Sequence, residues 1–283
     1  MGTSEYRLVD APVVFAPGAR DVSGVSQQPA PRPPIDPASL NVGAQDSMWT
    51  NLGFWPGAAS YAEAATALAF RVGQAAQLRA GDVVVDYACG YGDSLRLWVE
   101  RFGVARVIGV EPDAALARVV RARIVDWGLA DRISIECERA ERISPDSLAA
   151  DVSAVVCVDG AYHFESRRKW LLRSLQALPS GGRLGIADLV FAARAAGSWR
   201  IAGLARLVNV PAANLETTDE LETTIAGAGA RVRWSEGAGE AVLDGFCRNV
   251  SARGLPIELT RRMIRFARRG RLVDYRIIGC VRE

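Results

Sequence analysis

Short apolar runs alternate with segments of helical periodicity through most of the chain. Runs such as 83–85, 107–110 and 154–158 are rich in Val and Ile and predict buried strands. Between them, segments such as 113–127 and 166–178 repeat apolar residues every three or four positions and predict helices. Strands that alternate with helices form a mostly parallel sheet with helices on both faces. The pattern therefore predicts an α/β fold.

The remaining segments define the domain limits. Residues 1–45 include the proline-dense stretch 27–37 (QQPAPRPPIDP), which is unsuited to a helix or a central strand. We expect a flexible N-terminal arm over 1–45 and one domain over 46–283. Residues 191–216 are too long for a simple connection, so we expect a cap or lid there. Further strands are expected at 133–137, 183–187, 230–235 and 272–281. Further helices are expected at 60–78, 218–227, 241–253 and 256–269.

The composition narrows the class of partner. The chain has 283 residues and a net charge of +2, which is too small to indicate nucleic acid or an anionic membrane as the main partner. No apolar run approaches the roughly 18 residues that a membrane span needs. The N-terminus carries no secretory signal pattern. These features predict a cytoplasmic protein without a membrane or nucleic-acid partner.

Cysteine and histidine usage limits the chemistry. The five cysteines show no C-x₂-C pairing, which predicts free thiols in a reducing compartment. His163 is the only histidine and Lys169 the only lysine, so a multi-histidine metal site and a P-loop G-K-[ST] are both excluded. The acidic residues form no obvious divalent cluster. We expect no metal.

A glycine-containing loop follows the first strand of the α/β pattern. In VVVDYACGYGDSL (83–95), Gly90 and Gly92 let the backbone approach a ligand. The third glycine of a dinucleotide-binding G-x-G-x-x-G is absent. Asp86 would repel a pyrophosphate but attract a cationic, amino-bearing ligand. This favours S-adenosylmethionine (SAM) over NAD.

A second acidic residue ends the next strand. Glu111 in VIGVEPD follows the loop by about 20 residues, a spacing typical of a carboxylate that accepts the hydroxyls of a ribose. This spacing suits either cofactor and predicts a ribose site without choosing between them.

Several motifs occur together in order: NLGFW, VVVDYACGYGD, VIGVEPD, AVVCVDGAYHF and LPSGGRLGIADL. With these, residues 51–189 resemble the class I SAM-dependent methyltransferases, in particular the small-molecule, natural-product group. The resemblance implies a Rossmann-like fold with a mostly parallel central sheet, helices on both faces and a helical cap. It implies methyl transfer from SAM, which leaves S-adenosylhomocysteine (SAH), to a small-molecule acceptor in specialised metabolism.

The resemblance also implies the cofactor residues. The expected set is Asp86, Ala88, Cys89, Gly90, Gly92, Glu111, Pro112, Ala140 and Asp159. Asp159 is expected near the methionine moiety and the transferred methyl. One position departs from the family pattern, because Arg139 stands where an acidic residue that holds the adenine amino group is expected. Arginine has no acceptor, so Glu138, Glu141 or a backbone group is expected to take its place.

Methyl transfer needs a base only if the acceptor must lose a proton. The catalytic candidates are His163, Tyr162 and Asp188. Each also has a structural alternative. His163 could pack at the following helix, the ring of Tyr162 could fill the core, and Asp188 could cap a turn or helix. Residues expected to close over cofactor and substrate are Phe54, Trp55, Tyr61 and Trp199, with plain hydrophobic packing as the alternative.

Arg261, Arg265 and Arg268 share one face of the predicted helix 256–269. A solvated face is the commoner explanation, and an anionic substrate is the other. Alternatives for the whole chain are an RNA or protein methyltransferase, a non-catalytic SAM-binding domain and an NAD(P) oxidoreductase. The acceptor and the oligomeric state, a homodimer included, stay open.

Overall fold

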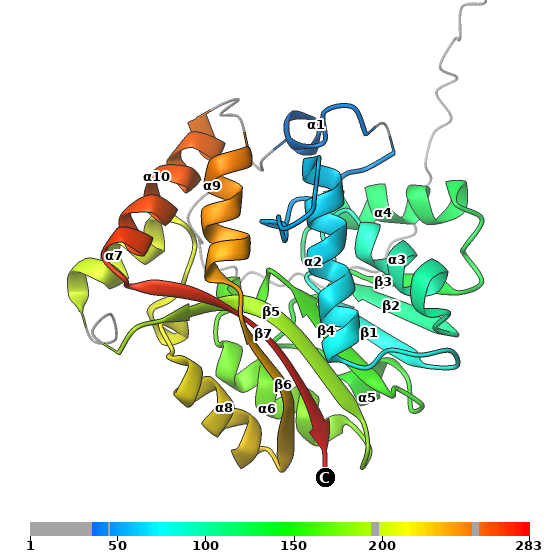
Figure 1. Ribbon diagram of the computed structural model, residues 1–283. Coiled ribbons are helices and arrows are strands. Elements are labelled where there is room, and N and C mark those ends of the chain that lie inside the picture. Colours follow the sequence, from blue (N-terminus) through cyan, green and yellow to red (C-terminus); the bar gives the residue numbers. More distant parts are fainter. Residues whose placement is uncertain (1–35, 45, 194–197, 251–254) are drawn as a thin grey trace, which may run out of the picture. The chain divides into compact units, whose positions relative to one another are not determined.

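The computed structural model describes residues 36–44, 46–193, 198–250 and 255–283. A seven-stranded sheet in the order β3-β2-β1-β4-β5-β7-β6 lies at its centre (Figure 1). The strands are β1 (Val83–Tyr87), β2 (Arg106–Val110), β3 (Ile133–Glu136), β4 (Ala154–Val158), β5 (Arg183–Phe191), β6 (Ala230–Gly237) and β7 (Val273–Arg282). Strands β1 to β5 are parallel, and β7 is antiparallel to both neighbours. The prediction of a mostly parallel sheet is confirmed.

Helices connect the strands and cover both faces. The longer helices are α2 (Tyr61–Ala75), α3 (Asp93–Phe102), α4 (Ala114–Asp126), α6 (Arg167–Ala177), α7 (Trp199–Leu207), α8 (Thr218–Gly227) and α10 (Leu255–Arg269). Shorter turns are α1 (Pro37–Leu40), α5 (Pro145–Leu148), η1 (Ala161–His163), η2 (Ala212–Asn214), the π-helical turn η3 (Glu240–Asp244) and α9 (Gly245–Asn249). Among the described residues, no helix is both long and apolar enough to cross a membrane.

The alternating side chains of the strands build two cores. One core packs α2, α3 and α4 against residues such as Val84, Val107 and Ile277. The other packs α6 and α8 against residues such as Val85 and Ile186. Figure 1 shows these two sets of helices on opposite sides of the sheet. This double cover is what the near-continuous apolar strands predicted.

Helix α2 lies very close to the sheet. The hydroxyl of Ser60 caps its start by accepting from the N–H of Glu63. Near its other end, a Cβ at Gly279 would lie 2.0 Å from the carbonyl oxygen of Ala75, and a Cβ at Gly185 would lie 2.7 Å from that of Val72. Only glycine therefore permits this packing.

The structure corrects three sequence predictions. Strand β5 runs to Phe191 rather than 187, because β7 pairs with it along its whole length. The helix predicted at 241–253 consists of η3 and α9 up to residue 249. Helix α1, whose Leu40 is buried, lies within the expected arm. The rest of that arm, residues 1–35 and 45, lies outside the described part of the chain.

Candidate functional site

The loop between β1 and α3 has a left-handed backbone at three positions: φ is 58° at Ala88, 55° at Gly90 and 86° at Gly92. A Cβ at Gly92 would lie 2.9 Å from Cγ1 of Val120, so close packing requires glycine there. A Cβ at Gly90 would meet only Oγ1 of Thr50, at 3.7 Å. The loop thus leaves room beside Gly90, and α3 begins directly after Gly92. Backbone at such a place can approach a ligand closely.

Glu111 joins this loop to the end of β2. Its Oε2 accepts from the N–H of Gly90 at 3.2 Å, and its Oε1 accepts from the N–H of Asp113 at 3.1 Å. Burial raises the pKa of this carboxyl, and the two backbone donors lower it. Each oxygen can accept a further hydrogen bond. The structure therefore brings together the expected ribose residue and the glycine loop.

Asp86 lies beneath the same loop. Its Oδ2 accepts from Nε1 of Trp98 in α3 at 2.7 Å, and the side chain is 1% exposed. Burial raises the pKa of this carboxyl to about 6, while hydrogen bonds from Ser94 and Trp98 act in the opposite direction. In the structure Asp86 fixes α3 below the loop. Its direct contact with a ligand stays a prediction.

Residues 46–55, here called the strap, are tied to the loops at the carboxyl ends of the strands. The N–H of Met48 donates to Oδ1 of Asp93 at 3.2 Å. The N–H of Leu52 donates to Oδ2 of Asp159 at 2.7 Å, across 107 positions of sequence. Two carboxylates at this edge of the sheet therefore hold the strap in place.

The aromatic side chains near the strap are buried. Phe54, Trp55 and Tyr61 are 8%, 9% and 7% exposed. The guanidinium of Arg71 lies 4.0 Å from the ring centre of Phe54, and the hydroxyl of Tyr61 donates to the carbonyl of Asn51 at 2.5 Å. Phe54 and Trp55 pack into the core, in line with the alternative of plain hydrophobic packing, and their closure over a ligand stays a prediction.

Asp159 directly follows β4. Its backbone is left-handed, with φ of 56°, and strained non-glycine positions of this kind cluster at functional sites. Oδ1 accepts from the hydroxyl of Tyr275 in β7 at 2.8 Å. Burial raises the pKa of Asp159 to about 7, while the groups of Tyr275, Leu52 and Tyr162 that face the carboxylate lower it. Tyr275 is a site residue that sequence reasoning missed. It lies on the same inward face of β7 as Val273 and Ile277, which occupy every second position of the strand.

A buried ion network occupies the neighbouring strand end. Arg167 is 0% exposed, and its guanidinium donates to Oδ2 of Asp188 at 2.8 Å and to Oε2 of Glu216 at 3.0 Å. Asn214 accepts from the N–H of Arg167 and donates to the carbonyls of Tyr162 and Phe164. Asp188 therefore serves as the charge partner of Arg167, which sequence reasoning also missed.

Tyr162 and His163 lie on η1, directly after Asp159. Tyr162 is buried, and its N–H donates to Oδ1 of Asp188 at 3.2 Å. His163 is exposed, and its Nδ1 lies 2.9 Å from the carbonyl oxygen of Asn209. This contact ties η1 to the chain after α7. Among the groups that act on the pKa of the Asp159 carboxylate are two of the three catalytic candidates, Tyr162 and Asp188.

The remaining expected residues are placed as follows. Cys89 and Ala140 are buried and Pro112 is exposed. Arg139 forms an ion pair with Glu141 at 3.7 Å. Which group holds an adenine stays a prediction. Trp199 begins α7 in the expected cap, but its side chain lies outside the described part of the chain.

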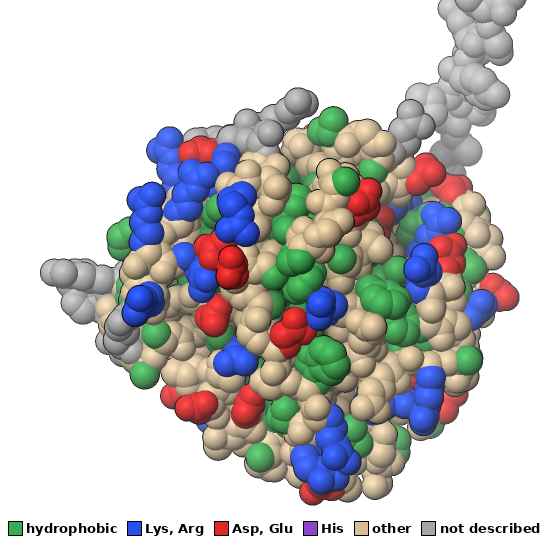
Figure 2. Space-filling view, in the orientation of Figure 1, with side chains coloured by type: hydrophobic (Ala, Val, Ile, Leu, Met, Phe, Trp, Pro, Cys, Tyr) green, Lys and Arg blue, Asp and Glu red, His purple; other side chains and the backbone are tan. Residues whose placement is uncertain are grey.

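The arginine face of α10 is a surface feature. Figure 2 shows basic side chains gathered over this region, and the basic residues of α10 are all arginines. Arg261 pairs with Glu258 at 3.3 Å, and Arg268 pairs with Asp244 at 2.7 Å, while Arg265 is exposed. These contacts favour the solvated face over an anionic substrate site.

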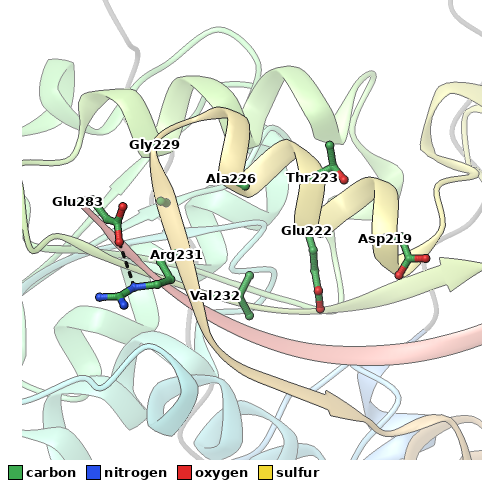
Figure 3. A pocket seen from close by; sticks show the side chains of 9 residues that line it. Asp219, Glu222, Thr223, Ala226, Gly229, Arg231, Val232 and Glu283 are labelled. Carbon is green, nitrogen blue, oxygen red and sulfur yellow. Dashed lines mark ion pairs between the residues drawn. The ribbon is translucent and has the colours of Figure 1, made fainter.

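A pocket of about 660 Å³ lies between α8 and β6, lined by residues such as Asp219, Glu222 and Arg231 (Figure 3). The side chains of Arg231 and Glu283 form an ion pair across 3.0 Å. Strand register places the start of β6 beside the end of β7, and thus beside the start of β5. The pocket therefore lies at the edge of the sheet opposite to the glycine loop.

The residues at the carboxyl edge fit SAM. Gly90 leaves open space for a ligand against the backbone, and Glu111 can accept hydroxyl donors. Glu111, Asp86 and Asp159 surround the loop, and burial raises the pKa of each. A cationic ligand would stabilise their ionised forms, whereas a pyrophosphate would be repelled. The charges thus suit a ligand with a sulfonium and an amino group.

Residues 84–182 match the family model of the methyltransferase domain. The erythromycin 3''-O-methyltransferase of Saccharopolyspora erythraea is 29% identical over 146 residues, which are 51% of this chain and 47% of that protein. The geranyl diphosphate C-methyltransferase of Streptomyces coelicolor A3(2) has a similar structure, with a TM-score of 0.67, 18% identity and 80% of each chain covered.

The structure of the [4+2]-cyclase SpnF is also similar, with a TM-score of 0.66, 15% identity and coverage of 88% of this chain and 97% of that one. At such identities the structural likeness shows the fold and not the reaction. The chain spans about half the length of the curated relatives it matches. The match of residues 84–182 to the methyltransferase domain, the sheet order and the glycine loop agree with one another, and this part of the chain is similar to methyltransferase domains of Rossmann-like fold.

Proposed function

We propose that this protein binds SAM and transfers its methyl group to a small-molecule acceptor in specialised metabolism. The observation that carries the proposal is the contact between Glu111 and the N–H of Gly90, which sets a hydroxyl-accepting carboxylate beside an open glycine loop. The family match over residues 84–182 supports it. So do natural-product relatives such as the erythromycin 3''-O-methyltransferase.

In this proposal, each group of residues at the carboxyl edge of the sheet has a separate role. The loop around Gly90 and the carboxylate of Glu111 bind the cofactor, which supplies an electrophilic methyl group when bound. The strap, held by Asp93 and Asp159, covers this edge and limits access of water. The Arg167 network fixes η1, so that the groups after β4 keep their orientation.

We also infer a cytoplasmic location. All five cysteines are free thiols in the structure, which is typical of proteins from reducing compartments.

The test is transfer of label from methyl-labelled SAM to a panel of small alcohols, phenols, glycosides, amines and thiols. We expect label in at least one small-molecule acceptor, and loss of that transfer in Glu111→Gln. Label that appears only in added RNA or protein would support the macromolecular alternative. Tight SAM binding without transfer to any acceptor class would support a non-catalytic SAM-binding domain.

A further inference from the structure

We propose that Asp159 is the proton acceptor of the methyl-transfer reaction and that the acceptor substrate is therefore a neutral hydroxyl compound. This inference rests on the proposed function and adds to it a named base and a class of acceptor. It reassigns Asp159, which the family resemblance gave only as a cofactor contact.

The first observation is the position of Asp159. Strands β1 and β4 are neighbours, with Tyr87 opposite Cys157, so the residues that follow them emerge side by side. A Cβ at Gly160 would lie 2.7 Å from Cβ of Ala88, which shows that the two loops touch. Asp159 thus stands next to the glycine loop, at the edge where ligands of such sheets bind.

The second observation is that Asp159, taken as a whole residue, is less buried than the other carboxylates at this edge. Burial raises the pKa of four carboxyls at this edge. Asp86, Glu111 and Asp188 are at most 8% exposed, whereas Asp159 is only partly buried. Asp188 is neutralised by Arg167, and Asp86 is bonded to Trp98. Of these four residues, Asp159 is the one that is not fully buried.

The third observation is the set of donors. The N–H of Leu52 and the hydroxyl of Tyr275 donate to the carboxylate, and the side chain of Tyr162 lowers its pKa. A carboxylate offers about four acceptor positions, so acceptor capacity remains for a substrate hydroxyl. The two tyrosines fix the carboxylate and, through their donors, stabilise its ionised form.

The charged groups around Asp159 leave it able to take up a proton. Asp188 on β5 raises its pKa, and the donors on the strap, η1 and β7 lower it. Burial is the largest cause, and it brings the pKa to about 7. A base with a pKa near the working pH is the effective kind.

The proposed step balances as follows. The acceptor oxygen forms a bond to the methyl carbon, and the carbon–sulfur bond breaks with its electron pair going to sulfur. The hydroxyl proton passes to Asp159, which later releases it to water. An alcohol binds neutral at pH 7 and must lose its proton, so it needs this base.

The first experiment needs no acceptor. The Asp159 carboxyl is followed by NMR in protein labelled with [¹³C]aspartate, and Asp159→Asn identifies its signal. We expect a titration midpoint near pH 7 in the free protein and in the SAH complex. In the SAM complex, the sulfonium should lower the midpoint by about one unit or more. Tyr275→Phe should raise it, because a hydrogen bond to the ionised form is lost.

The same titration can overturn the inference. A carboxyl that stays ionised below about pH 5 has no use as a base at neutral pH. Equal midpoints with SAM and SAH would place Asp159 away from the methyl group. Failure of SAM to bind, measured separately by calorimetry, would instead refute the proposed function.

The second experiment uses the acceptor panel. For a hydroxyl acceptor, we expect kcat/KM to rise with pH to a plateau above pH 7, as Asp159 loses its proton. Asp159→Asn should lower kcat by about 100-fold or more and abolish this rise, with little change in the KM for SAM. Asp126→Asn, an exposed carboxyl on α4, is the matched control. Exclusive methylation of amines, thiols or carbon, or an unchanged kcat in Asp159→Asn, would overturn the proposal.

Discussion

Arg167→Met is expected to lower the free energy of unfolding by about 3–5 kcal/mol at pH 8, because it leaves two carboxylates without their shared cation. Asp188 is 1% exposed and Glu216 is 8% exposed, so water cannot replace the guanidinium. The guanidinium also donates to the carbonyl of Leu189 at 2.6 Å. Urea unfolding of the variant and the parent protein measures the difference.

The decrease in the free energy of unfolding caused by Arg167→Met should depend on pH. Burial raises the pKa of Asp188 to about 6, and Arg167 opposes this rise. A carboxyl with a raised folded-state pKa stabilises the fold below its unfolded pKa, and this contribution is lost as the pH rises through the folded-state value. Without Arg167 the pKa rises further, so the variant should lose less stability at pH 5 than at pH 8.

Arg168→Met is the matched control for this change. Arg168 is the next residue on α6 and is exposed, so its removal should alter stability by less than about 0.5 kcal/mol. A loss from Arg167→Met as small as that of the control, or a larger loss at pH 5 than at pH 8, would contradict the account of the network.

Glu111→Gln should weaken SAM binding by about 10- to 100-fold, which corresponds to the loss of a hydrogen bond to a charged group. The amide keeps the size of the side chain but accepts at only one of its two terminal atoms. Its other terminal atom is a donor, which faces either the N–H of Gly90 or that of Asp113. Calorimetric titration with SAM measures the change.

Glu136→Gln provides the control, since Glu136 ends the adjacent strand β3 and is exposed. Its affinity for SAM should equal that of the parent protein. Equal affinities in all three proteins would remove Glu111 from the cofactor site, although SAM could still bind elsewhere at this edge.

The parts of the fold that sequence predicted are those with local patterns. Apolar runs and helical periodicity identify β1 to β4 and the helices between them, because each pattern fits one strand or one helix. Gly90 and Gly92 are readable for the same reason, since glycine marks the positive φ that their turn requires. Helix α1 was not predicted, because a single helical turn is too short to show a periodic pattern of apolar residues.

The parts of the site that sequence missed depend on contacts across the fold. Nothing near Arg167 indicates that it is buried, because its partners Asp188 and Glu216 lie 21 and 49 positions away. The placement of Asp159 at a strand end was predictable. Its donors on the strap and on β7 lie 107 and 116 positions away, so its role as a shared acceptor required the structure.

The most direct test of the central claim is a calorimetric titration of the protein with SAM and, separately, with NADH. The negatively charged surroundings of the glycine loop and the position of Glu111 predict SAM binding with a Kd in the micromolar range, about −8 kcal/mol, and no measurable binding of NADH. Binding of NADH, or absence of SAM binding, would contradict the proposed function and leave only the α/β fold established.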